Sequence, residues 1–194
     1  TPLPVPAGAS GAFPTEINDL DVIVGVANMS SGRRAIRWTP SGAGYAVEVL
    51  PLLPGELASY ATGINNLGQV VGARAGILGT PFGFGWLYAD AGGLVDLNAR
   101  YDWFATPQAI NDAGVILAGT QTFDLTTETV NDVGLSGPPN YNAIGGVDIN
   151  NNGLIVGSGD YGPVVAFDPQ TGLPERVRTL DYDNIWGDIT YDYV

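Results

Sequence analysis

The chain has 194 residues, of which 45% are hydrophobic, enough for one globular domain with a core. Twenty acidic residues stand against seven basic ones, all of them Arg, so the formal net charge is −13. Because such a surface repels phosphates, we expect no nucleic-acid partner. The absence of Cys, His and Lys excludes disulfides, zinc sites built on Cys or His, and Ser-His or Ser-Lys catalysis.

The first 14 residues predict an extended arm. They contain Pro2, Pro4, Pro6 and Pro14, which favour an extended backbone over a packed strand. Such a segment makes few contacts of its own. We expect it to be ordered by lying on another surface.

A repeated motif runs through residues 15–194. Each copy reads Ile, then an Asn-rich turn, then a β-branched run that ends in Gly. The copies begin at Ile17, Ile64, Ile110 and Ile149, at spacings of 47, 46 and 39 residues. Such periods are typical of propeller blades or of paired-helix repeats, and the turn chemistry with β-branched runs favours strands. We therefore predict an all-β fold: a β-propeller or propeller-like array of about four short antiparallel units, at about 15–62, 63–108, 109–147 and 148–188, then a terminal strand.

Further strands are predicted within each unit. A strand with a large aromatic residue follows the motif at 35–38, 82–86 and 164–167, and places Trp38 and Trp86 at equivalent positions in the core. A third strand follows at 47–50, 94–97 and 177–180, and residues such as 60–63 form a fourth before the next Ile. The third unit lacks the aromatic-Trp strand, and its residues 131–147 predict a loop or an irregular blade.

The motif Ile-Asn-Asn/Asp-x-Gly-x-Val-Val-Gly, followed by an aromatic strand and Leu-x-x-Leu, resembles the HAF repeat of bacterial extracellular proteins. The resemblance covers roughly Thr15 to Leu180 and is poor in the third unit. The His of the family's repeat is absent. The resemblance implies a secreted or envelope-attached bacterial protein with propeller-like repeats, and the family has no established shared chemistry.

Little catalytic chemistry remains available to this chain. Paired carboxylates could support glycoside hydrolysis, but none of the five Glu has a distinctive context. We expect no enzyme and no cofactor, and a carboxylate-based glycoside hydrolase is the third reading of the function.

One segment is a calcium candidate. Asp148, Asn150 and Asn152 place oxygen donors at alternate positions before Gly153, as calcium loops do. The alternative is a plain hairpin turn, since Asn-Gly is a strong turn pair.

Two aromatic groups are predicted to bind a partner. Tyr101, Trp103 and Phe104 fall between strands, where exposed aromatics would mark a partner surface. The tail from 181 to 194 contains Trp186, Tyr191 and Tyr193. Alternation at Ile189, Tyr191 and Tyr193 predicts a strand that closes the array against its first unit or pairs with another chain.

We therefore expect a non-catalytic structural or interaction protein outside the cytoplasm (periplasmic, secreted or on the cell surface), docked as an accessory subunit on a larger envelope or membrane assembly. A carbohydrate-binding protein is the alternative. No transmembrane segment is expected, since the longest apolar stretch, 75–89, falls short of a membrane span. Residue 1 is Thr and the single Met is Met29, which fits a removed signal peptide or a trimmed chain.

Overall fold

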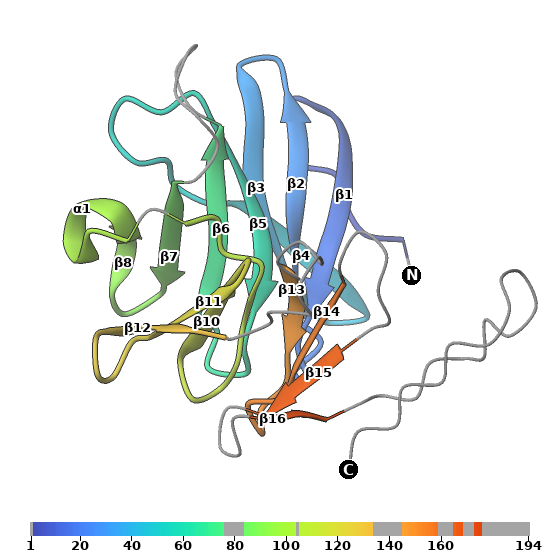
Figure 1. Ribbon diagram of the computed structural model, residues 1–194. Coiled ribbons are helices and arrows are strands. Elements are labelled where there is room, and N and C mark those ends of the chain that lie inside the picture. The colour runs from blue at the N-terminus through green and yellow to red at the C-terminus, as the bar shows by residue number, and fades with distance from the viewer. Residues whose placement is uncertain are drawn as a thin grey trace, which may run out of the picture.

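The computed structural model describes residues 2–75, 84–103, 105–133, 145–158, 165–168 and 173–175. The described residues form sixteen strands and one helix of five residues (Figure 1). The prediction of an all-β fold is confirmed.

The strands form four antiparallel sheets of four strands, and each sheet is built from strands that are consecutive in the chain. The first sheet contains β1 (Ala9–Ile17), β2 (Ile23–Met29), β3 (Gly32–Ser41) and β4 (Gly44–Val49). The second contains β5 (Ala58–Ile64), β6 (Val70–Ala75), β7 (Gly85–Ala89) and β8 (Gly93–Asp96), and the helix α1 (Leu97–Tyr101) follows it. The third contains β9 (Ala109–Ile110), β10 (Val115–Ala118), β11 (Gln121–Asp124) and β12 (Thr129–Asp132). The fourth contains β13 (Gly145–Ile149), β14 (Ile155–Ser158), β15 (Val165–Asp168) and β16 (Leu173–Glu175).

The boundaries between units differ from the predicted ones. The Ile-Asn turn joins the first two strands of each sheet, so the strand before each Ile belongs to the same sheet as the turn. The first two sheets therefore begin at Ala9 and Ala58, and the predicted starts at 15 and 63 are wrong. The arm is correspondingly shorter than predicted, because Pro14 pairs with Gly25 inside β1. An edge strand tolerates Pro because its outward N–H needs no partner.

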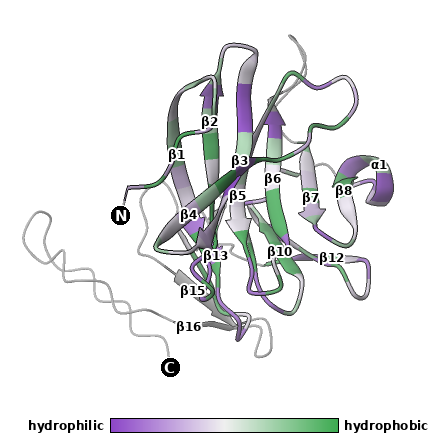
Figure 2. Ribbon diagram, turned by 180° about the vertical axis from the view of Figure 1, so that it is seen from behind, coloured by the Kyte–Doolittle hydropathy of each residue, from purple (hydrophilic) through white to green (hydrophobic). Residues whose placement is uncertain are grey.

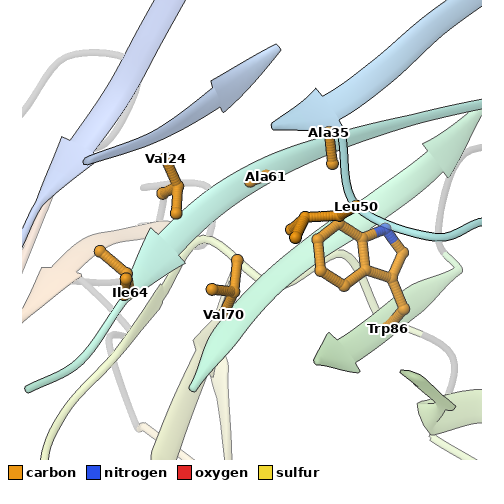
Figure 3. Packing of buried hydrophobic residues seen from close by; sticks show 7 residues of the cluster. All are labelled: Val24, Ala35, Leu50, Ala61, Ile64, Val70 and Trp86. Carbon is orange, nitrogen blue, oxygen red and sulfur yellow. The ribbon is translucent and has the colours of Figure 1, made fainter. Parts of the chain in front are cut away.

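Consecutive sheets stack face to face around shared hydrophobic clusters. Between the first and second sheets, Val24, Ala35 and Leu50 pack against residues of β5, β6 and β7: Ala61, Ile64, Val70 and Trp86 (Figure 3). A second cluster joins the second sheet to the third, and a third cluster joins the third to the fourth. Within the described ranges, no such cluster joins the first sheet to the fourth. Hydrophilic and hydrophobic segments both occur along the strands (Figure 2), as expected for sheets whose buried positions alternate with more exposed ones.

An aromatic residue stands at one fixed register in every sheet. This aromatic residue lies on the third strand of the sheet and pairs across to the second strand, with the residue six positions after the motif Ile. The pairs are Ile23 with Trp38, Val70 with Tyr88, Ile116 with Phe123, and Ile155 with Phe167. Trp86 instead pairs with Gly72, so the predicted equivalence of Trp38 and Trp86 is wrong. The third unit also has its aromatic, because Phe123 supplies it.

The first strand carries a β-bulge at the same place in three of the four sheets. The register shifts around Thr15, Thr62 and Val147, each two residues before the motif Ile. Since a bulge twists the strand sharply, the recurring bulge gives these three sheets a common bend next to the turn.

Candidate functional site

The asparagine after each motif Ile builds the turn that follows it. Oδ1 of Asn65 accepts hydrogen bonds from the amides of Leu67 and Gln69, at 3.1 and 2.9 Å. Asn18 and Asn150 make the same pair of bonds, and Asn111 makes the second one. A short side-chain acceptor therefore satisfies turn amides that the sheet cannot reach.

The same asparagines connect each turn to the next one. Nδ2 of Asn18 donates to the carbonyl of Asn65 at 2.9 Å, and Nδ2 of Asn65 donates to the carbonyl of Asn111 at 2.9 Å. Nδ2 of Asn111 donates to the carbonyl of Asn150 at 3.2 Å. We call this series of bonds, together with the one in the next paragraph, the asparagine ladder.

The second residue after each Ile adds a parallel series. The amide of Asp19 donates to Oδ1 of Asn66, the amide of Asn66 to Oδ1 of Asp112, and the amide of Asp112 to Oδ1 of Asn151, at 2.7–2.9 Å. The Asn66 amide group also donates to carboxylate oxygens of both Asp19 and Asp112. Because Asp and Asn alternate along this series, a side-chain amide of Asn lies beside a carboxylate of Asp, to which it donates.

A hydroxyl near the bulge strengthens the first two junctions. Oγ1 of Thr15 donates to the carbonyl of Ala61 at 3.0 Å, and Oγ1 of Thr62 donates to the carbonyl of Pro107 at 2.9 Å. The turns and the bulges together fix the spacing between the first strands of neighbouring sheets.

The four turns surround one pocket of about 200 Å3. Every sheet contributes to it through the end of its first strand and the turn that follows, and its carboxylates are Glu16, Asp19, Asp112 and Asp148. Glu16 and Asp148 each accept a hydrogen bond from the following amide. Because the charged lining groups are all acidic, the pocket attracts cationic or hydrogen-bond-donating groups.

Large apolar side chains are exposed on the turns beside this pocket. Ile17, Leu20 and Leu67 are 51%, 61% and 69% exposed. Leu20 and Leu67 occupy equivalent positions in neighbouring turns that the asparagine ladder joins. We call these three residues, with the pocket rim, the turn face.

The calcium candidate folds as a hairpin turn between β13 and β14. Oδ1 of Asn150 is occupied by the amides of Asn152 and Leu154, and Oδ1 of Asp148 by the amide of Ile149. No group of three or more Asp, Glu or His side chains in the described ranges is placed to hold a metal ion.

The predicted partner-binding aromatics are placed only in part. Trp103 is 4% exposed and its ring stacks on Phe123 at 5.2 Å between centroids, so its predicted surface position is wrong. The cause is α1: Asp96 caps the helix, and Nδ2 of Asn98 donates to the Trp103 carbonyl at 2.6 Å, which turns the segment inward. Tyr101 packs on the same Phe123, at 4.7 Å. Phe104, Trp186, Tyr191 and Tyr193 lie outside the described residues.

The ion pairs among the described residues lie outside the lining of the pocket, and the pair of Arg37 with Asp90 connects the first sheet to the second. Arg37 of β3 pairs with Glu48 and, at 2.8 Å, with Asp90, and this hydrogen bond lowers the pKa of Asp90. Burial raises the pKa of Glu56 despite its ion pair with Arg74 at 3.0 Å.

The chain matches no known protein family, no curated protein and no solved structure. No helix in the described part of the chain is both long and apolar enough to cross a membrane.

Proposed function

We propose that this chain is a non-catalytic structural or interaction protein that works outside the cytoplasm, as an accessory subunit docked on a larger envelope assembly. The turn face is the docking surface. The resemblance of the motif to the HAF repeat supports the compartment, and the geometry of the turns supports the binding role.

The observation that carries the proposal is the exposure of Leu20 and Leu67. Large apolar side chains held outward on neighbouring, hydrogen-bonded turns are costly in water and are typical of interaction surfaces. The ladder makes this surface rigid, so little conformational entropy is lost when a partner binds.

We further propose that the four sheets are arranged as propeller blades around the pocket. Two features support this arrangement: the first strands β1, β5, β9 and β13 all contribute to one pocket, and neighbouring sheets pack face to face. Each blade then presents its turn at the same end of the axis.

Carbohydrate binding is the second candidate, favoured by the pocket alone. Its amide and carboxylate groups could bind sugar hydroxyls. The aromatic platforms that this function needs have less support, because Trp38, Trp86 and Trp103 are all buried. Binding of a glycan panel to the wild type, lost in Asn66→Ala, would favour this candidate over protein docking.

The test replaces the apolar residues of the turn face by Asp. In L20D/L67D we expect the chain to leave its native assembly and to sediment as free protein, with an unchanged melting temperature. The matched control is L57D, since Leu57 is 66% exposed but precedes β5 at the end remote from the turn. Retention of L20D/L67D in the assembly would contradict the proposed docking surface.

A further inference from the structure

The residue before the motif Ile is acidic in two units and small in the other two. It is Glu16 in the first unit and Asp148 in the fourth, whereas the second and third units have Gly63 and Ala109. All four residues line the pocket that the turns surround. The first and fourth units therefore bring one carboxylate each to the same cavity, from equivalent positions in their first strands.

Close packing between units explains the small residue of the second unit. A Cβ added at Gly63 would stand 3.0 Å from Cα of Ala109 and 3.3 Å from the amide nitrogen of Ile110, which is tighter than Cβ contacts in proteins usually are. The second unit thus has no room for a longer side chain at this position. The same packing gives no reason for a negative charge at Glu16 or Asp148.

The carboxylates of the pocket differ in what they bind. Asp112 accepts from the main-chain and side-chain amides of Asn66, and Asp19 accepts from the same Asn66 side chain, so both belong to the asparagine ladder. Glu16 and Asp148 accept instead from the amide of the very next residue, at 3.0 and 2.8 Å. These local bonds orient the two carboxylates without joining one unit to another, so the ladder does not require their charge.

The size of the pocket favours one side chain of a docked protein over a separate small molecule. Its volume is about 200 Å3, whereas pockets for small molecules and cofactors measure about 300–1,000 Å3. Within the described ranges, the acidic side chains do not converge as metal ligands do. A cationic side chain with several hydrogen-bond donors suits both the volume and the spread of the carboxylates.

We propose that the partner places one arginine side chain in this pocket, with the guanidinium between Glu16 and Asp148. This step rests on the docking function of the turn face and specifies the chemistry of its partner. A guanidinium presents five N–H donors in a planar fork and is less strongly hydrated than the compact ammonium of lysine, which suits two separate carboxylates. The apolar stem would lie against Ile17, which lines the pocket and is 51% exposed.

Titration of the free protein with amino-acid derivatives at matched ionic strength tests this occupant. The probes are the N-acetyl methylamides of arginine, of lysine and of citrulline, which is the neutral isostere of arginine. In heteronuclear NMR spectra, the arginine probe should shift the amide signals of Ile17 and Ile149 saturably, because these amides donate to the two carboxylates. The lysine probe should bind more weakly, and the citrulline probe should cause no saturable shift.

The double variant E16Q/D148N should bind the arginine probe about tenfold more weakly or worse, because hydrogen bonds to charged groups are lost. The matched control is D21N/E128Q, which removes the same formal charge at exposed residues outside the pocket lining. This control should bind the probe as the wild type does. Both double variants should keep the wild-type melting temperature, since Gln and Asn retain a side-chain oxygen that can accept from the next amide.

Equal affinity of the arginine probe for the wild type and for E16Q/D148N would overturn the proposal. Equal affinity of the wild type for the arginine and citrulline probes would do the same, and this comparison needs no variant. Tighter binding of the lysine probe would exclude the guanidinium as the preferred group, and the absence of a saturable shift up to the solubility limit would leave the pocket without this occupant.

The titration and the L20D/L67D test fail separately, because the titration uses the free protein. If the titration fails while L20D/L67D leaves the native assembly, the docking surface stands and the arginine does not. If L20D/L67D stays in the assembly while the titration succeeds, the docking function of the turn face is wrong and the pocket keeps its preference for a guanidinium.

Discussion

The side-chain amide of Asn65 joins its own turn to the next one: Oδ1 accepts from the amides of Leu67 and Gln69, while Nδ2 donates to the carbonyl of Asn111 at 2.9 Å. One residue thus shapes a turn and holds the neighbouring sheet. Asn65 is 3% exposed; its bond to the Asn111 carbonyl is buried, and its two turn bonds are partly buried. The repetition of Asn at this position is explained by this double role.

Replacing Asn65 by Ala should destabilise the protein strongly. The amides of Leu67 and Gln69 would lose their acceptor, and the Asn111 carbonyl would keep only its hydrogen bond from the Gly114 amide. This loss should cost about 2–4 kcal/mol of unfolding free energy. The matched control is Asn152→Ala, an exposed asparagine in another turn whose side chain makes no hydrogen bond within the described ranges. Urea unfolding measures both, and equal stability of the two variants would contradict the role of the ladder.

Replacing Gly72 by Ala should disrupt the second sheet. A Cβ there would lie 2.2 Å from Cζ2 of Trp86 and 2.3 Å from the carbonyl oxygen of Tyr60, distances at which the strand must shift. We expect a loss of about 3 kcal/mol or more in unfolding free energy, because the added Cβ would require both the strand backbone at Tyr60 and the buried ring of Trp86 to move. Gly92→Ala, with no atom within 4 Å of the added Cβ, is the control and should be close to neutral.

Removal of residues 1–5 should expose the outer face of the first sheet. Ile36 and Trp38 are 0% and 1% exposed, and Leu3 and Pro4 contribute to their cover. We expect a loss of about 2–3 kcal/mol from the exposed apolar area and the lost bond to the indole. Tryptophan emission should shift to the red. Val5→Ala, at a 51% exposed position, should leave both quantities unchanged, and an unshifted deletion variant would contradict the covering role.

Ionisation of Glu56 should reduce stability as the pH rises. Burial raises its folded-state pKa above the ordinary 4.5, so the folded protein holds this proton more tightly than the unfolded chain does. Protonated Glu56 therefore contributes its full share of the unfolding free energy below the ordinary pKa, and this share is lost as the pH rises through the raised pKa of the folded protein. Relative to Glu56→Gln, the wild type should therefore lose unfolding free energy between pH 4.5 and neutral pH. A parallel pH dependence of the two proteins would refute this assignment.

The repeat was predictable from the sequence because turn residues and β-branched runs follow local rules. The motif Ile precedes each of the four turns and is the last residue of the first strand in its sheet, at Ile17, Ile64, Ile110 and Ile149. The residue at which each sheet begins was not predictable in this way, since the spacing of the motifs does not show whether a sheet begins before or after its Ile. The pairing between strands determines where each sheet begins.

Long-range contacts account for the other differences. Trp86 and Tyr88 are two residues apart, and their register opposite β6 shows that Tyr88 is the counterpart of Trp38. Trp103 is buried because the cap at Asp96 and the amide of Asn98 turn the chain inward. The ladder itself had a sequence signal: Asn or Asp stands at both positions after every motif Ile.

The most direct test of the proposed function is the structure of this protein inside its native assembly. We predict a partner protein in contact with Leu20 and Leu67, covering the pocket that the four turns surround. A turn face open to solvent in the intact assembly, with the contacts made elsewhere on the chain, would contradict the proposal.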